Sequence, residues 1–258
     1  MDVGEGDSNF IRTYAGKTVL IDGGGSANPD RTSKVGETVI VPFLLDSGVS
    51  RLDAVIATHP HADHIQGLRD VLEQMKVGRL ILPSLADESG FAGLIQAAEA
   101  KNVPVSVCSK GETIRLDDRT YLQVLSPELK CSVQDASLNN ASLVLKLCYG
   151  QTAVLFTGDA ETEVEEKLLE NASVLSADVI KIAHHGSLSS TGRAFLEKVT
   201  PRAAIISVGK NNFGHPSPVT MALLEQSNVN CFRTDECGAV LLKSDGRNVK
   251  IKRTVAGK

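Results

Sequence analysis

The sequence predicts one α/β domain with layered sheets, and three observations lead to this prediction. Short apolar runs typical of buried strands alternate with segments whose apolar residues have helical spacing, in both halves of the chain. The 258 residues suffice for one large domain or two small ones, but no linker, repeat or low-complexity tract divides them. Because strands and helices alternate throughout, we expect helices to cover the faces of the sheets.

The first half of the chain is expected to form strand–turn–strand and then strand–helix units. One glycine-rich stretch precedes the first strand and another follows the second, so the backbone there can approach other groups closely. The expected strands are 9–13, 18–21, 52–57, 79–83 and 103–107, and the expected helices are 39–45, 65–75 and 93–100. In the second half the expected strands are 113–116, 121–125, 143–147, 153–157, 179–183 and 205–209, with a helix over 161–169.

Composition restricts the classes of function. Only 4% of the residues are aromatic and none is Trp, which favours an aliphatic core and argues against base-stacking platforms. A net charge of -4 gives no general attraction to nucleic acid, so a polyanionic substrate would need a local basic patch or metal ions. No apolar run approaches the roughly 18 to 20 residues of a membrane span, and no signal segment opens the chain. We therefore expect no membrane insertion by this segment.

The cysteine pattern favours free thiols. The 5 cysteines are an odd number, so they cannot all pair, and no C-x-x-C motif occurs. Free thiols in apolar surroundings are therefore expected. Cys231 and Cys237 are close enough in sequence to form a bridge in an oxidising compartment.

The motif around which the chain is organised is residues 58–64, THPHADH, between an expected strand and an expected helix. It places four potential metal ligands within six residues: His59, His61, Asp63 and His64. Imidazole and carboxylate are preferred by borderline divalent metals of the first transition row. The alternation directs His59 and His61 at one point, while Asp63 and His64 can reach another. This arrangement suits two metals that act together on water and on a phosphate or carbonyl oxygen.

Further candidate residues follow other strands. Asp159 comes after a buried strand and Gly158, where it could bridge two cations or equally cap the helix over 161–169. Adjacent histidines after a strand point to opposite sides, so one of His184 and His185 could bind metal while the other transfers a proton. Asp22, at the end of a buried strand, is expected to orient a ligand histidine, and Asp7 is expected to do likewise.

The 6 histidines of the chain all lie on expected loops that follow strands. The last of them, His215, belongs to the segment 214–216, GHP. Core packing does not explain such a co-location, and the sequence therefore predicts a metal-dependent active site.

These motifs resemble the metallo-β-lactamase superfamily, whose H-x-H-x-D-H hallmark corresponds to His59, His61, Asp63 and His64. Within that superfamily the chain is similar, over nearly its whole length, to the C-terminal domain of the ComEC family of DNA-uptake channels. The similarity lies in the order and spacing of residues 2–7 (DVGEGD), 20–24 (LIDGG), 139–145 (NNASLVL), 156–160 (FTGDA), 183–187 (AHHGS) and 214–216 (GHP).

The resemblance implies a four-layer αββα sandwich over residues 1–258, as one domain of a larger membrane protein. It implies two divalent metal ions, Mn²⁺ or Zn²⁺, with Asp159 as the bridging ligand and one of His184 and His185 as the last ligand. The implied function is a nuclease that degrades the DNA strand not taken up during natural transformation, outside the cytoplasmic membrane. The implied partners are DNA and the channel and DNA-binding domains of the parent protein. Alternatives are a hydrolase of small phosphodiesters or phosphorylcholine esters and a non-catalytic DNA-binding gate.

One position departs from the family pattern. Many members have a third histidine ligand between the hallmark and the bridging Asp, but residues 65–183 contain none. Asn139 or Asn140, and more remotely Asp135, falls at that place, and Asn140 is taken as the ligand. An amide oxygen is a harder and weaker donor than imidazole, so one site should bind less tightly and favour Mn²⁺ over Zn²⁺.

The remaining expectations concern catalysis and substrate contact. Asp63, Asp159 and His185 are expected at the reacting centre, and His215, or the free member of the His184/His185 pair, would protonate the leaving oxygen. The candidate phosphate contacts are Lys181, Ser187, Lys210 and Asn212. For Lys210 a solvated loop lysine fits the sequence equally well.

Overall fold

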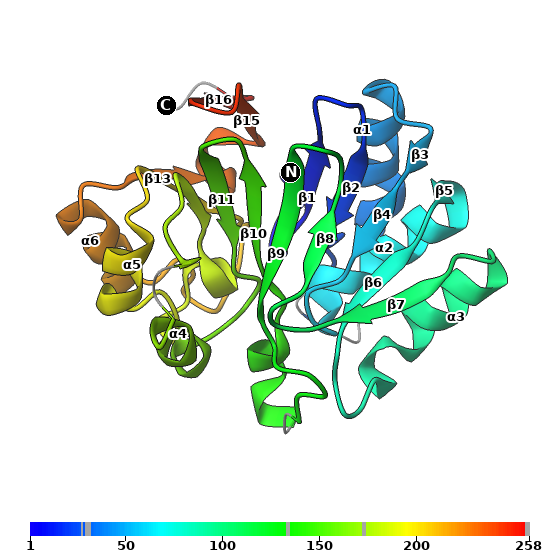
Figure 1. The fold of residues 1–258 in the computed structure, drawn as a ribbon, viewed down its shortest axis with the longest axis horizontal. Coiled ribbons are helices and arrows are strands. Elements are labelled where there is room, and N and C mark those ends of the chain that lie inside the picture. The colour runs from blue at the N-terminus through cyan, green and yellow to red at the C-terminus, as the bar shows by residue number, and fades with distance from the viewer. Residues whose placement is uncertain (27, 29–31, 133–134, 172–173, 256–258) are drawn as a thin grey trace.

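Two β-sheets face each other and carry helices on their outer faces (Figure 1). The computed structural model describes residues 1–26, 28, 32–132, 135–171 and 174–255, and the side chains of all of these except 135–137. The first sheet has the order β1-β2-β4-β6-β7. Its strands are β1 (Asn9–Arg12), β2 (Thr18–Ile21), β4 (Ala54–Ile56), β6 (Leu80–Pro83) and β7 (Val105–Cys108).

The second sheet has the order β14-β13-β12-β11-β10-β9-β8. From β8 to β11 neighbouring strands are antiparallel, and from β11 to β14 they are parallel. Its strands are β8 (Thr113–Arg115), β9 (Thr120–Ser126), β10 (Val144–Tyr149), β11 (Thr152–Phe156), β12 (Val179–Lys181), β13 (Ala203–Ile206) and β14 (Asn230–Arg233). Two small two-stranded sheets pair β3 (Arg51–Leu52) with β5 (Lys76–Val77) and β15 (Val240–Ser244) with β16 (Val249–Arg253).

The helices form the two outer layers, on the right and left of Figure 1. The first sheet is covered by η1 (Gly36–Ile40), α1 (Val41–Asp46), α2 (Ala62–Gln74) and α3 (Ala92–Ala100). The second sheet is covered by α4 (Thr162–Leu169), α5 (Arg193–Val199) and α6 (Pro218–Gln226). Short helical turns are η2 (Ser89–Phe91), η3 (Asp135–Ala141), η5 (Ala183–Gly186) and α7 (Thr234–Cys237).

The central strands are apolar on both faces because both faces are buried. In β2, Leu20 packs toward the helices, while Val19 and Ile21 pack between the sheets. In β11, Leu155 packs toward the outer helices, and the residues on either side of it pack between the sheets. This alternation produces continuous apolar runs rather than an apolar–polar pattern. The four-layer αββα sandwich expected from the sequence is therefore confirmed.

Most expected elements occur, but several boundaries differ, and the strand expected over 205–209 is β13, which ends at Ile206. The strand expected over 52–57 is divided into β3 and β4 by Asp53, whose side chain accepts a hydrogen bond from the Thr18 backbone N–H at 2.9 Å. The strand expected over 179–183 ends at Lys181, and the histidines that follow lie in the turn η5. All five cysteines are free thiols, as expected, and no bridge joins Cys231 to Cys237.

Parallel pairing places the functional loops together. Strands β2 and β4 are parallel, as are β11, β12 and β13, so the loops after these strands leave at the carboxyl ends of their sheets. The loops that carry the candidate residues follow β2, β4, β11, β12 and β13. The sheets thus bring residues far apart in the sequence to one edge of the sandwich.

The packing of the second sheet gives a stability prediction. Leu155 is fully buried against α4 and α5, so Leu155→Ala should lower the free energy of unfolding by about 2–5 kcal/mol in chemical denaturation. The matched control is Leu45→Ala, because Leu45 is 55% exposed, and it should change stability by about 0.5 kcal/mol or less. Equal losses in the two variants would contradict this description of the core.

Candidate metal centre

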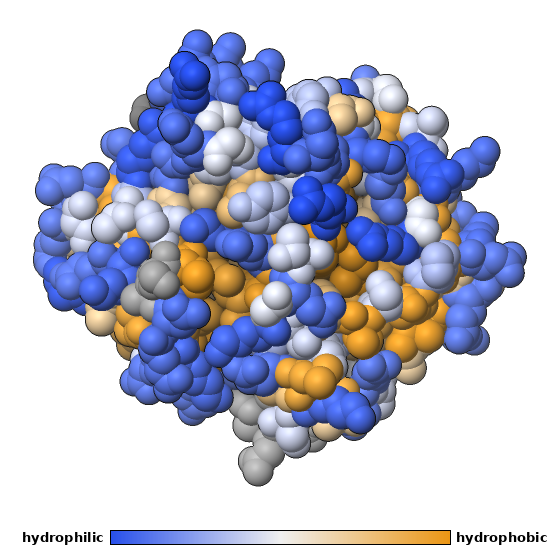
Figure 2. Space-filling model, viewed as in Figure 1, coloured by the Kyte–Doolittle hydropathy of each residue, from blue (hydrophilic) through white to orange (hydrophobic). Residues whose placement is uncertain are grey.

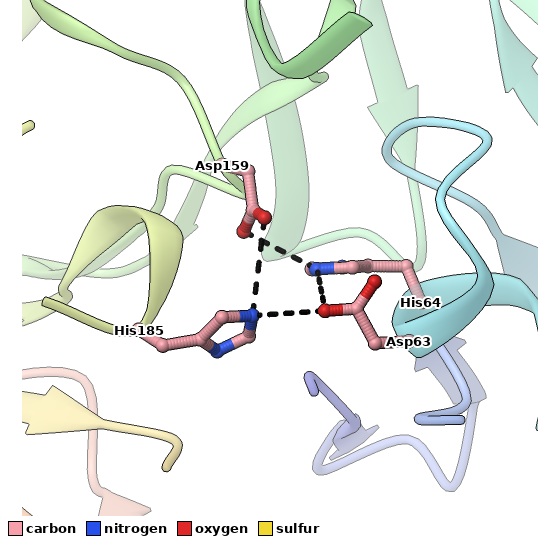
Figure 3. A group of neighbouring side chains, drawn as sticks. All are labelled: Asp63, His64, Asp159 and His185. Atoms are coloured by element: carbon pink, nitrogen blue, oxygen red, sulfur yellow. Dashed lines mark hydrogen bonds and ion pairs between the residues drawn. The ribbon is translucent and has the colours of Figure 1, made fainter. Parts of the chain in front are cut away.

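The first group of candidate ligands joins the two halves of the sandwich. Asp63 and His64 lie in the first turn of α2, Asp159 follows β11, and His185 lies in η5 (Figure 3). His64 Nε2 lies 3.2 Å from Asp159 Oδ1, and His185 Nε2 lies 3.3 Å from Asp63 Oδ2. One ligand atom from each of the four side chains falls within 4.8 Å of all the others. These atoms surround a point where a cation fits.

The second group shares Asp159 with the first. His59 Nε2 lies 3.6 Å from Asp159 Oδ2 and 3.2 Å from His61 Nδ1. His59, His61 and Asp159 again offer ligand atoms within 4.8 Å of one another. The THPHADH motif therefore contributes candidate ligand atoms to two groups that share the Asp159 carboxylate. Helix capping does not explain Asp159, because α4 has Glu161 at its N-cap and no side-chain cap hydrogen bond.

Hydrogen bonds orient the ligand histidines from outside. Buried Asp22 accepts a hydrogen bond from His64 Nδ1 at 2.9 Å, and it also binds the backbone N–H and the hydroxyl of Thr58, both at 2.8 Å. The Thr58 hydroxyl in turn lies 3.2 Å from His59 Nδ1. With Nδ1 of both rings occupied in this way, Nε2 of each ring is left free to face the centre.

His185 is held in a similar way from the other sheet. Its Nδ1–H donates to the Ser207 carbonyl at 2.9 Å, and Asp7 Oδ1 lies 3.6 Å from the same nitrogen. Asp7 is itself paired with Lys181, whose Nζ lies 2.8 Å from Oδ1. Asp22 and Asp7 thus lie behind His64 and His185, two histidines of the first group.

Lys181 is a correction to the expected substrate contacts. Its side chain is buried, and its ammonium donates to the Ile182 carbonyl at 2.8 Å in addition to pairing with Asp7. A buried and fully engaged ammonium does not reach a substrate phosphate. Lys181 instead compensates the charge of Asp7 behind His185.

The His184/His185 pair also differs from expectation. Both residues have left-handed backbone conformations, with φ of 48° and 52°, so the strand alternation that would separate their side chains is lost. The two rings lie 6.2 Å apart, and both approach Asp159. His185 is buried in the first group, whereas His184 is partly exposed and lies 3.3 Å from Glu161. The two histidines therefore differ in how deeply they are buried, and their side chains do not point to opposite sides of the backbone.

Asn140 is not placed as a ligand. Its amide oxygen accepts a hydrogen bond from the Glu161 backbone N–H at 3.0 Å, and its amide nitrogen donates to Glu163 at 3.1 Å. Both polar atoms of the side chain are therefore bonded to the start of α4. Asn139 is the better placed of the two. Its Nδ2 lies 3.4 Å from His184 Nδ1, and its Oδ1 is buried without a hydrogen bond among the described residues. The side chain of Asp135 lies outside the described residues.

The remaining candidates lie around the rim. His215 approaches His184 and His185 with ring centroids 5.4 and 6.2 Å away, and its Nδ1 lies 3.3 Å from Glu5. Lys210 and Asn212 are exposed on the same loop as His215, after β13. Ser187 is buried next to η5, where its hydroxyl lies 3.0 Å from that of Ser189.

Sequence reasoning missed two residues that shape this rim. Glu5 contacts His215 and accepts a hydrogen bond from the Gly209 backbone N–H at 3.0 Å. Asn211 closes the 209–215 loop, because its amide binds the backbone of Gly209, Phe213 and His215. The glycine-rich DVGEGD motif was a signal for the first of these, but an isolated loop asparagine carries no signal for the second.

Neighbouring imidazoles favour the charged form of the Asp159 carboxylate. Burial would raise the pKa of Asp159, but His64, His185 and His59 together hold it well below its usual range. Burial likewise opposes charge on His185, yet Asp159, Asp63 and Asp7 raise its pKa to about 9. Burial, with the neighbouring His64, lowers the pKa of His59 well below its usual value. The carboxylates and imidazoles of the centre thus compensate one another's charge, and a bound cation held by neutral imidazoles would take over that role.

The side chains present fit divalent cations. His64 Nε2 and Asp159 Oδ1 are buried and face the centre, where they lie 3.2 Å apart as an ion pair and make no further hydrogen bond among the described residues. Buried polar atoms with so few partners are costly, and a cation between them would satisfy both. The donor set is nitrogen and oxygen without thiolate, which suits Zn²⁺ or Mn²⁺.

Comparison with known proteins gives the family. A family model described as the metallo-beta-lactamase superfamily matches residues 1–210. The chain belongs to the metallo-β-lactamase superfamily. Among solved structures, this metallo-β-lactamase domain is similar to CmlA, a diiron beta-hydroxylase from Streptomyces venezuelae, with a TM-score of 0.61, 16% identity and coverage of 97% of this chain and 53% of that one. It is also similar to Zn(2+)-bound PqqB from Methylobacterium extorquens, with a TM-score of 0.55, 12% identity and coverage of 88% and 85%. At these identities the likeness shows the fold.

Curated relatives are named as competence and recombination proteins. ComE operon protein 3 of Bacillus subtilis (strain 168) is 36% identical, over 96% of this chain and 33% of the relative. Competence protein ComA of Neisseria gonorrhoeae is 30% identical, over 98% of this chain and 33% of the relative. Recombination protein 2 of Haemophilus influenzae is 31% identical, over 82% and 24%. The metallo-β-lactamase domain thus spans a third or less of the length of these relatives. Among the described residues, no helix is both long enough and apolar enough to cross a membrane.

The role of Asp22 gives a prediction about metal affinity. Asp22→Asn weakens the acceptor of the His64 Nδ1–H and of the Thr58 hydroxyl, so Mn²⁺ and Zn²⁺ affinity should fall about 10- to 100-fold. Isothermal titration calorimetry of the metal-stripped protein measures this change. The matched control is Asp46→Asn, since Asp46 is exposed at the end of α1. Unchanged affinity in Asp22→Asn would contradict the positioning role.

Proposed function

We propose that this chain is a metal-dependent phosphodiesterase that hydrolyses DNA during its uptake in natural transformation. The observation that carries the proposal is Asp159, one buried carboxylate between two groups of ligand atoms. Such a centre suits in-line displacement at phosphorus. The similarity to competence proteins supports DNA as the source of the phosphodiester.

We assign the metal ligands by the two groups. His59, His61 and Asp159 would hold one divalent cation, and Asp63, His64, His185 and Asp159 would hold the other. His184 and Asn139 lie beside the centre, where they would complete the coordination of a less tightly bound ion. Bound Mn²⁺ or Zn²⁺ supplies Lewis acidity, which activates water and neutralises charge that develops on the phosphate.

Side chains of the protein itself orient the ligands, transfer the proton and contact the substrate. Asp22 and Asp7 keep the ligand histidines oriented, and burial excludes bulk water from Asp159. His215 lies at the rim, oriented by Glu5, where it can deliver a proton to the leaving oxygen. Exposed Lys210 and Asn212 on the same loop contact the substrate phosphates, and Ser187 supports the adjoining turn.

We further propose that the domain works outside the cytoplasmic membrane as part of a longer channel protein with its own DNA-binding parts. The support is the similarity to competence proteins about three times the length of the matched segment. The degraded molecule is then the DNA strand that is not transported.

Asp159 provides the decisive test of the activity. Labelled duplex and single-stranded DNA should be cleaved in Mn²⁺ or Zn²⁺ but not in EDTA, and Asp159→Ala should abolish cleavage because it removes the ligand common to both groups. Gel electrophoresis of the products, with Asp46→Ala as the control, measures this. Cleavage by Asp159→Ala would refute the assignment. DNA binding without cleavage in every metal would instead support a non-catalytic gate.

A separate prediction concerns His215. Because its ring lies at the rim and belongs to neither ligand group, His215→Ala should lower kcat about 10²- to 10⁴-fold while the bound metal content stays unchanged. Steady-state kinetics measures the change in kcat, and mass spectrometry measures the bound metal content. A loss of metal equal to the loss of activity would show that His215 is a ligand instead.

A further inference from the structure

The ribbon formed by β15 and β16 has two unlike faces. Its register pairs Leu242 with Ile251 and Lys243 with Lys250. Leu242 and Ile251 pack against the core between the two sheets. The alternate side chains point the other way, and we call them the ribbon face: Leu241, Lys243, Lys250 and Lys252, all of them exposed.

The ribbon face concentrates positive charge without compensation. Lys243 lies directly opposite Lys250, an arrangement that is destabilising for like charges. None of the three lysines, nor Arg247 in the turn, forms an ion pair within the part of the chain that the structure describes. The nearby carboxylate of Asp245 is engaged by the backbone N–H groups of Arg247 and Asn248, at 2.8 and 2.7 Å. In a chain of net charge -4, this face is locally basic.

Aromatic side chains adjoin the turn of the ribbon. Gly246 lies against Tyr149, and its carbonyl accepts a hydrogen bond from the Gln151 N–H at 2.7 Å. Tyr149 stacks on Tyr14 with ring centroids 5.9 Å apart, and the Arg119 guanidinium lies over both rings at 5.1 and 5.4 Å. Tyr14 is 55% exposed. Tyr149 is half-buried, so one exposed aromatic ring lies beside these basic groups, a combination found on surfaces that bind nucleic acid.

The ribbon lies at the end of the sandwich away from the metal centre. The turn of the ribbon contacts the β10–β11 hairpin, and β11 runs from that hairpin toward Asp159. A strand of 5 residues spans roughly 17 Å, so the two surfaces are separate. Figures 1 and 2 show the ribbon at the top of the molecule, where the surface is hydrophilic.

We propose that the ribbon face binds the phosphate backbone of DNA, as a contact separate from the metal centre. The proposal rests on the proposed function in that it takes a polynucleotide as the substrate. An antiparallel two-stranded ribbon fits the major groove of a duplex, and lysines bind phosphates without regard to sequence. A membrane surface is a poorer match, because Leu241 is the one aliphatic side chain on the ribbon face, and interfacial binding needs a broad apolar area.

The test uses the whole chain in EDTA, where binding is separated from cleavage. Fluorescence anisotropy with a labelled duplex measures Kd for the triple variant Lys243→Glu, Lys250→Glu, Lys252→Glu. The matched control changes three exposed lysines elsewhere to Glu: Lys76, Lys101 and Lys198. The ribbon variant should bind at least tenfold more weakly, with the slope of log Kd against log salt reduced by about 2–3, and the control should lose clearly less. The Lys→Gln triple variant gives the same comparison if the Glu variant unfolds.

Two further arms separate this proposal from others. Hydrolysis of bis(4-nitrophenyl) phosphate in Mn²⁺ should be unchanged in the ribbon variant, because that small diester needs the metal centre alone. Failure of the wild type to hydrolyse it would count against the proposed function and leave the binding result intact. Equal DNA binding by wild type and ribbon variant would overturn the ribbon proposal. The ribbon proposal would also be overturned if the ribbon variant lost binding to phosphatidylglycerol vesicles and kept its binding to DNA. That result would identify the face as a membrane contact.

Discussion

The buried carboxylate of Asp159 is the constraint on which the rest of this structure depends. It belongs to the second sheet, yet it lies against His59 and His64, which the first sheet and α2 supply. A buried carboxylate without compensation would shift to its neutral form, but the surrounding imidazoles keep its pKa well below the usual range. The seam between the two halves of the sandwich is therefore also the place where the charges of the centre balance.

Hydrogen bonds and ion pairs behind the histidines fix the positions of the charged groups in the centre. Asp22 fixes His64 directly and His59 through the Thr58 hydroxyl, so one residue after β2 orients two ligands. On the other sheet, Lys181 and Asp7 form a buried ion pair behind His185. Breaking such a pair leaves one buried charge and typically costs about 3–5 kcal/mol. The geometry of the centre is thus fixed by buried groups that lie behind its histidines.

Local sequence patterns predicted what depends on local geometry. Short continuous apolar runs predicted the central strands, and the spacing of His59, His61, Asp63 and His64 predicted two converging groups. What failed depends on backbone conformation or on distant partners. The left-handed turn at His184 and His185 removes the expected alternation, and nothing in the sequence reports it. The commitment of Asn140 to α4 and of Lys181 to Asp7 arises only once separate segments pack together.

The layered architecture also explains how chemistry and attachment to a polymer can be divided. Parallel strands deliver ligands to the carboxyl ends of the sheets, and hairpins such as β10–β11 and the β15–β16 ribbon turn at the other end. Substitutions on the ribbon leave Asp159 and its histidines unchanged, because β11 and its buried neighbours lie between them. A change that tunes affinity for a charged polymer therefore need not disturb the electrostatic balance at the centre. If the centre and the ribbon act as proposed, the two properties can be varied and measured separately.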